Sequence, residues 1–261
     1  VGKLDNLAWL LNLRAMDIQC TPYAMAYCYV TPDKATLFID TARVSAEAAA
    51  ELKENGVELV EYDDVLTFLA AQAEEQTVLA DPVSVNYAVY QTLQANPALT
   101  VKDEADPLLP MKGVKNEVEL AHTREAHIRD GVAMVKFLKW LTPAVQAGRQ
   151  TELSISRKLE ELRSEQDLFC GNSFDTIAGY AHHGAVVHYE PTPETDLELL
   201  PKGLLLLDSG AQYEDGTTDI TRTIALGSVN EEERHDYTLV LKGHIRLARA
   251  KFPKGCSGTQ L

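Results

Sequence analysis

Apolar and polar positions in the first 110 residues alternate between short apolar runs and longer, helix-like patterns. Short apolar runs bounded by turn residues are typical of buried strands, and a longer stretch that ends at Asn-Gly is typical of a helix. The predicted elements are, in chain order, strands at 27–30 and 35–39, a helix at 44–54, a strand at 57–60, a helix at 65–73 and a strand at 77–80. This alternation predicts an α/β layer.

A stretch rich in proline and charge interrupts the pattern at residues 103–113. Pro107 and Pro110 each fix φ and lack a backbone donor, so neither a helix nor a central strand is expected to continue through them. We therefore predict a domain boundary here, with one domain at 1–110 and a second at 111–261.

Three helices are predicted in the second part, at 116–141, 151–166 and 230–251. In the first of them apolar residues recur at steps of three and four, which predicts one buried face. That face consists of Val118, Ala121, Ile128, Val132, Val135 and Leu138. His122 and His127 lie off it and are expected to be exposed. The third helix begins with Asn230 three residues before Glu233, as in a capping box, which explains the acidic run at 231–233 without metal ligands.

Strands are expected between the second and third helices, at 174–180, at 186–189 and in a hairpin of 204–213 with 217–226. His182 and His183 lie in the preceding loop and are expected to be exposed. His188 lies at the end of the 186–189 strand, before a proline-bounded turn, where it can point into a cleft. An ordinary structural histidine explains His188 equally well.

Asp208 and Asp219 interrupt the apolar or hydroxyl-rich strands of the hairpin. A carboxylate there is costly unless something such as a cation offsets its desolvation. If the loop is Glu214-Asp215, Asp208 faces Thr221, and both aspartates share one sheet face at roughly 7–8 Å between Cα atoms. A three-residue loop would place them on opposite faces. Spacing alone leaves open two structural carboxylates or a shared site for Mn²⁺, Mg²⁺ or Ca²⁺.

Composition and charge narrow the classes of function. Lys and Arg total 24 and Asp and Glu total 39, a formal charge of −15, which disfavours binding to nucleic-acid phosphates. No stretch approaches the roughly 18 apolar residues of a membrane span. The 4 cysteines form no C-x-x-C pair, so neither a disulfide framework nor a thiolate zinc site is expected, and an intracellular, cytoplasmic protein fits best.

The motif Asp208-Ser209-Gly210-Ala211-Gln212-Tyr213, followed by Asp219-Ile220-Thr221-Arg222-Thr223, resembles the Xaa-Pro aminopeptidases (aminopeptidase P) of the pita-bread metallopeptidases. The resemblance extends to His188-Tyr189-Glu190-Pro191-Thr192 and to the opening residues 4–14. It implies a creatinase-N-like (ribonuclease H-like) α/β domain followed by the first half of a pita-bread catalytic domain.

The resemblance also implies roles for individual residues. Asp208 would bind one metal ion, Asp219 would bridge two, and His188 would hydrogen-bond the substrate near the scissile carbonyl. The two ions, usually Mn²⁺ in this family, would hold a hydroxide that attacks the bond before proline. The family's remaining ligands, a histidine and two glutamates, would follow Leu261. We therefore expect an excerpt of a larger enzyme, truncated at both ends and inactive by itself.

Two other functions stay open at this point. One is a prolidase, which cleaves free Xaa-Pro dipeptides, and the other is a metal-free pita-bread protein that binds other macromolecules. The expected partners are peptides with proline at the second position, with no nucleic acid and no membrane, and the resemblance leaves a homodimer open.

Overall fold

The computed structural model describes all residues from 1 to 261 and divides into two compact units, Val1–His122 and Thr123–Leu261. The chain passes from one unit to the other inside helix α6 (Glu117–Ala147), beyond the proline-rich stretch at which the sequence predicts a boundary. None of the helices combines the length and the apolarity that crossing a bilayer requires.

The first unit is an α/β layer, as the alternating pattern predicts. Its elements are α1 (Leu4–Leu11), β1 (Ala26–Val30), β2 (Ala35–Ile39), α2 (Ala46–Glu54), β3 (Val57–Glu61), α3 (Val65–Ala70), β4 (Gln76–Ala80), α4 (Tyr87–Ala95), β5 (Leu99–Asp103) and α5 (Leu108–Gly113). Strand β2 pairs antiparallel with β1 and parallel with β3, and β4 pairs parallel with β5. The predicted strands and helices between residues 27 and 80 are confirmed, apart from shifts at their ends.

Two aspartates of this unit form ion pairs with neighbouring side chains. Asp5 forms an ion pair with Lys112, and Asp17 forms one with Arg43 at 2.6 Å.

The proline-rich stretch contains a short helix that includes Pro110, so the expectation that no helix continues through the prolines is wrong there. Helix α5 begins at Leu108, directly after Pro107, and Pro110 is its third residue. The first four amides of any helix lack an intrahelical partner, so a proline in this turn loses no hydrogen bond.

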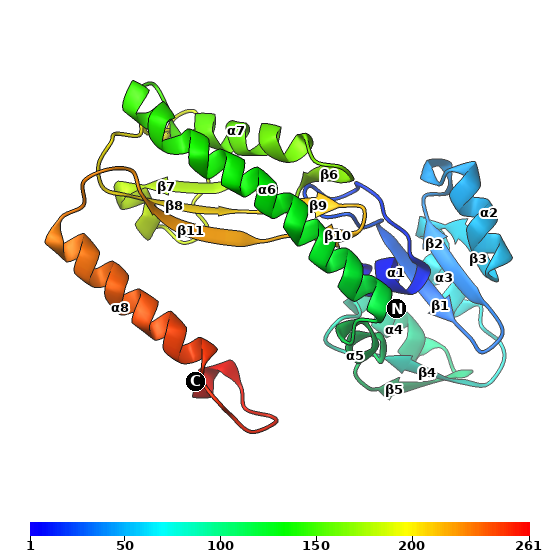
Figure 1. Cartoon of the computed structure of the whole chain (residues 1–261). Coiled ribbons are helices and arrows are strands. Elements are labelled where there is room, and N and C mark those ends of the chain that lie inside the picture. The colour runs from blue at the N-terminus through cyan, green and yellow to red at the C-terminus, as the bar shows by residue number, and fades with distance from the viewer. The chain divides into compact units, whose positions relative to one another are not determined.

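The second unit places two helices on one face of a small sheet. Its elements are α6, α7 (Glu152–Ser164), β6 (Phe169–Asn172), β7 (Ile177–Tyr180), β8 (Leu204–Ser209), β9 (Ala211–Tyr213), β10 (Gly216–Thr217), β11 (Ile220–Ala225) and α8 (Glu231–Ala248). The strands form two three-stranded sheets, in the orders β11-β8-β7 and β10-β9-β6. Figure 1 shows α6 and α7 along the β7, β8 and β11 strands, and their apolar side chains form one core with that sheet.

Side chains alternate sharply along the central strand β8. Leu205 and Leu207 are fully buried under the helices, whereas Leu204, Leu206 and Asp208 point the other way and are half-buried. The sheet therefore has one covered face and one open face, and Asp208 is on the open face.

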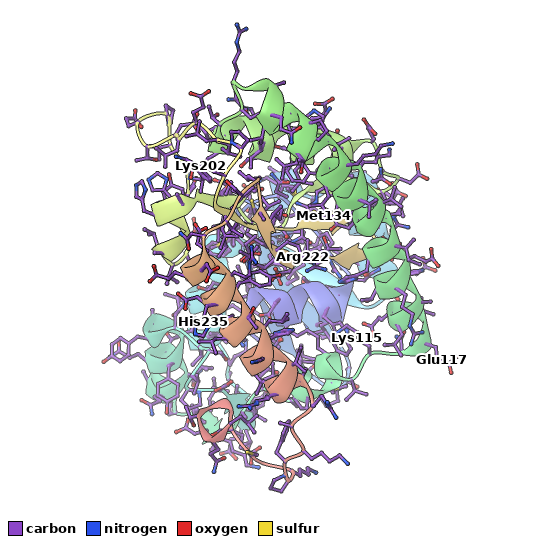
Figure 2. The ribbon with its side chains drawn as sticks, turned by 60° about the vertical axis from the view of Figure 1, so that its left-hand side comes forward. Lys115, Glu117, Met134, Lys202, Arg222 and His235 are labelled. Atoms are coloured by element: carbon purple, nitrogen blue, oxygen red, sulfur yellow. The ribbon has the colours of Figure 1, made fainter.

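The buried face of α6 differs from the predicted one. Val118, Ile128, Val132 and Val135 are 61%, 59%, 45% and 67% exposed. The buried residues are Ala126, Asp130, Ala133, Met134, Phe137, Leu141 and Val145; Met134 is labelled in Figure 2. Asp130 lies in the middle of this buried face, and its charge interrupts the apolar pattern there, so the pattern favours the neighbouring face instead.

Other expectations for this part are confirmed. His122 and His127 are exposed, and Asn230 and Glu233 form the capping box at the start of α8.

The strands between α7 and β8 differ from the prediction. Strand β6 lies outside the predicted strands, and the strand predicted from residue 174 begins only at Ile177.

Candidate metal centre

Asp208 and Asp219 are brought together by the hairpin. Asp208, on β8, faces Thr221 of β11 on one side and Ile177 of β7 on the other. Gly216 faces Tyr213, so the loop is Glu214-Asp215, and the two-residue loop of the hairpin hypothesis is confirmed. Asp219 directly precedes β11 and, by the same register, lies on the open face beside Asp208.

The two carboxyl groups interact directly. The pKa of Asp219 is raised above its ordinary value of 3.8 by burial, by the negative charge of Asp208 and by a hydrogen bond with the Asp208 side chain. Neither aspartate forms an ion pair with lysine or arginine. The oxygen Oδ1 of Asp208 is buried and has no hydrogen-bond partner. A buried carboxylate oxygen without a donor is costly, and a cation would satisfy it.

This donor set fits a hard divalent cation in part. Carboxylate oxygens are the ligands that Mn²⁺ and Mg²⁺ prefer. Two adjacent carboxylates that repel each other when both are ionised would both gain from such an ion. No group of three His, Cys, Asp or Glu side chains in residues 1–261 is arranged to hold a metal. The two aspartates by themselves would supply only two of the roughly six oxygen ligands that such a cation usually takes.

A close approach of the backbone at Gly210 to Thr218 and Ser173, here called the Gly210 crossing, fixes the two aspartates relative to each other. A Cβ atom on Gly210, between β8 and β9, would lie 2.0 Å from the carbonyl oxygen of Thr218 and 2.2 Å from Oγ of Ser173. The backbones can approach this closely only at a glycine. Ser173 donates from Oγ to the Thr218 carbonyl at 2.9 Å and from its amide to the Gly210 carbonyl at 3.1 Å. These bonds hold the two strand segments that carry Asp208 and Asp219.

Arg163 and Asp130 form a buried ion pair next to Gly210. Arg163 is fully buried and donates from Nε and Nη2 to the two carboxylate oxygens of Asp130, at 2.8 and 3.2 Å. Tyr213 donates its hydroxyl to the same carboxylate at 3.1 Å, and burial and the charge of Asp130 raise the pKa of that hydroxyl. Arg163 Nη1 also lies 3.4 Å from the Gly210 carbonyl oxygen. The bidentate pair thus connects α6, α7 and the hairpin.

His188 is not on a strand, and the strand predicted at 186–189 is wrong. His188 is exposed, lies in a turn and has a left-handed backbone with φ of +55°. The apolar residues before it, Val186 and Val187, are 54% and 82% exposed, so their hydrophobicity does not reflect burial in a sheet. No hydrogen bond connects His188 to Asp208 or Asp219 in this structure.

The loop that leads to His188 contacts the open face of the sheet at Gly184. It starts with the 3₁₀ turn η3 (Ala181–Ala185), in which Gly184 approaches the backbone of Gly179 on β7. A Cβ on Gly184 would be 3.7 Å from Cβ of Leu206, the residue two before Asp208 on the same face of β8. At Gly184 the loop therefore packs on the sheet face that carries Asp208.

His183 corrects a further expectation, whereas the expected exposure of His182 is confirmed. The His183 side chain is only 14% exposed and its Nδ1 lies 3.0 Å from both carboxylate oxygens of Glu152, which is fully buried. Glu152 carries no sequence signal of its own, because a glutamate in the first turn of a helix is ordinary.

Comparisons with known proteins agree with this architecture. Residues 1–119 match the model of the creatinase/prolidase N-terminal domain, and residues 121–261 match the model of metallopeptidase family M24. The chain is 36% identical to aminopeptidase P1 of Arabidopsis thaliana, matching 100% of this chain and 47% of that protein. It is 40% identical to a probable Xaa-Pro aminopeptidase P of Sclerotinia sclerotiorum, matching 100% of this chain and 45% of that protein. The chain thus spans about half the length of the curated relatives it matches.

Solved structures show the same fold. An X-prolyl aminopeptidase of Caenorhabditis elegans, described as a cytosolic enzyme with a di-nuclear active site, superposes with a TM-score of 0.89 at 35% identity, over 98% of this chain and 43% of that one. A prolidase of Pyrococcus horikoshii superposes with a TM-score of 0.70 at 21% identity, over 96% of this chain and 67% of that one, and shows the fold alone.

Proposed function

The chain belongs to metallopeptidase family M24, and from this premise we propose that the protein hydrolyses the bond between an N-terminal residue and a following proline. The observation that carries the proposal is the pair of adjacent carboxylates, Asp208 and Asp219, with the orphaned Oδ1 of Asp208. Relatives named Xaa-Pro aminopeptidase P and the similar C. elegans enzyme support the choice of substrate.

In this proposal Asp208 and Asp219 are the residues of this chain that would hold two Mn²⁺ ions. When bound, such ions lower the pKa of water and supply a hydroxide nucleophile near neutral pH. The hard carboxylate oxygens favour Mn²⁺ over softer metals.

Other residues of the chain would hold the two aspartates in place and orient the substrate. The Gly210 crossing and the Asp130–Arg163 pair keep the aspartates on the open face of the sheet. His188, in the loop that packs on the same face, would hydrogen-bond the substrate near the scissile carbonyl and so orient it.

We further propose that the 261-residue chain is inactive by itself. Hard cations usually take about six oxygen ligands, and two carboxylates supply too few for tight binding. The proposed partners are peptides with proline second, and the proposed location is the cytoplasm. Light scattering would show whether two copies associate.

The proposal is tested by assaying the whole protein after metal removal with EDTA and after adding Mn²⁺ back. An Xaa-Pro-Pro tripeptide and an Xaa-Pro dipeptide serve as substrates. We expect tripeptide cleavage that depends on Mn²⁺ and that falls on the order of a hundredfold or more in Asp208→Asn and Asp219→Asn. Glu214→Gln, an exposed acid in the same hairpin loop, is the matched control and should retain activity.

The other outcomes identify the alternatives. Cleavage of the dipeptide alone would mean a prolidase. A protein that neither binds Mn²⁺ nor cleaves either peptide would be a metal-free binding protein, and the proposal would be wrong.

A further inference from the structure

Glu152 is a buried carboxylate that the proposed chemistry does not use. It is the first residue of α7 and is fully buried. Its oxygens are surrounded by four neighbours: the Tyr180 amide at 2.8 Å, His183 Nδ1 at 3.0 Å, the Tyr189 hydroxyl at 3.1 Å and the Leu197 amide at 3.2 Å. Such complete satisfaction is what a buried carboxylate requires.

Two of these four neighbours, His183 and Tyr189, lie in the 181–189 loop that carries His188, and a third, Tyr180, directly precedes that loop. Tyr180 is the last residue of β7, His183 lies inside η3, and Tyr189 directly follows His188. The carboxylate therefore contacts the chain directly before the loop, in its middle and at its end. An ionised carboxylate only accepts hydrogen bonds, so with Glu152 ionised His183 carries its proton on Nδ1.

The same loop holds two residues in the left-handed backbone region. Ala181 has φ of +52° and His188 has φ of +55°. Residues other than glycine adopt this region at a cost, and they keep it only when surrounding contacts hold them there. The contacts of Glu152 lie next to both of these residues, at Tyr180 and at Tyr189.

We propose that Glu152 is a positioning residue that holds the 181–189 loop in the conformation in which His188 is exposed with a left-handed backbone. Its consequence for catalysis rests on the proposed function, because His188 is assumed there to contact the substrate. The conformation of the loop can be measured without any assay of activity.

Two buried tyrosines offer a matched test. Tyr189 and Tyr180 are 8% and 6% exposed. The Tyr189 hydroxyl bonds Glu152 and Thr195, whereas the Tyr180 hydroxyl donates to the Lys202 carbonyl at 2.9 Å and does not contact Glu152. Tyr189→Phe and Tyr180→Phe each remove one buried hydroxyl, and only the first removes a contact of the Glu152 group.

The experiment measures kcat and KM of both variants in the whole protein loaded with Mn²⁺, and the NMR signals of the His188 ring in the 261-residue chain. For Tyr189→Phe we expect kcat about five-fold lower, with KM within about two-fold, and a shifted or broadened His188 signal. Tyr180→Phe should change neither. A general loss of structure would affect the two variants alike, so the difference between them separates positioning from stability.

Each result decides the proposal. Equal kcat values in the two variants, with the His188 signal unchanged in Tyr189→Phe, would overturn it. If the unmodified whole protein cleaves no Xaa-Pro peptide, the proposed function fails. The NMR comparison alone then decides, because a His188 signal displaced only in Tyr189→Phe supports the role of Glu152 and an undisplaced one excludes it.

Discussion

At the scale of single residues, the sequence suggests the pairing of Asp208 with Asp219, and the three-dimensional structure shows which groups surround them. The sequence places them on one sheet face if the hairpin loop has two residues, and the pairing of Asp208 with Thr221 confirms that register. Their mutual repulsion and the unsatisfied Oδ1 of Asp208 depend on distances that spacing does not give.

The repulsion predicts the effect of Asp219→Asn on the metal-free chain. Because the folded-state pKa of Asp219 is raised above 3.8, its protonation favours the folded state at low pH, and this contribution is lost as the pH rises through the raised value. Above that value the charged side chain is a small penalty. In EDTA at pH 7, Asp219→Asn should therefore raise the melting temperature by about 1–2 °C, and the gain should shrink as the pH falls toward 3.8.

Differential scanning fluorimetry of the 261-residue chain across this pH range checks the prediction. Glu214→Gln removes one negative charge from the same hairpin without touching Asp208, and should leave the melting temperature nearly unchanged. An Asp219→Asn variant that melts lower than the unmodified chain at pH 7 would contradict the inferred repulsion.

At the scale of the elements, the hairpin is shaped by backbone contact as much as by side chains. Strands β8 and β9 are separated only by Gly210, where the chain passes Thr218 and Ser173. The sequence predicts the two long strands of the hairpin, but the interruption at Gly210 is visible only in three dimensions.

Replacing Gly210 by alanine should destabilise the hairpin. The new Cβ would meet the Thr218 carbonyl oxygen at 2.0 Å, and forcing the backbones apart should lower the free energy of unfolding by about 1–3 kcal/mol. Gly131→Ala is the matched control, because a Cβ there, inside α6, meets nothing within 4 Å. The free energy of unfolding of that variant should be higher by about 0.5–1 kcal/mol. Urea unfolding of the 261-residue chain measures both, and equal effects would show that the close contact at Gly210 is not constraining.

At the scale of the whole molecule, helix α8 differs from every other long helix. It has 18 residues and no buried side chain. Apolar side chains on it stay exposed, among them Leu239 at 51%, Val240 at 73% and Leu247 at 55%. Helices in water owe most of their stability to the packing of an apolar face, which α8 lacks in this chain.

Hydrogen exchange should therefore distinguish α8 from α7. Helix α7 buries Ile155 and Leu159 completely, so its amides should open only with the core. The amides of α8 should exchange at least about a hundredfold faster in the 261-residue chain at neutral pH, because local unfolding there exposes no core. Mass spectrometry of peptides from the two helices measures the ratio, and similar protection in both would mean that α8 is packed in solution.

The sequence by itself determined the order of most strands and helices, the capped start of α8 and the presence of two aspartates in the hairpin, because each depends on neighbours in the chain or on a fixed period. It left the hairpin loop open between two and three residues, and the pairing of Gly216 with Tyr213 in the structure decided for two. Only the tertiary structure decided which face of α6 is buried, since Asp130 lies in that face and is neutralised by Arg163 from another helix. It also decided that His188 lies in a strained turn and that Glu152 holds its loop. Ion pairs and hydrogen bonds between residues distant in the sequence leave no periodic trace along it, so they become visible only when the chain is folded.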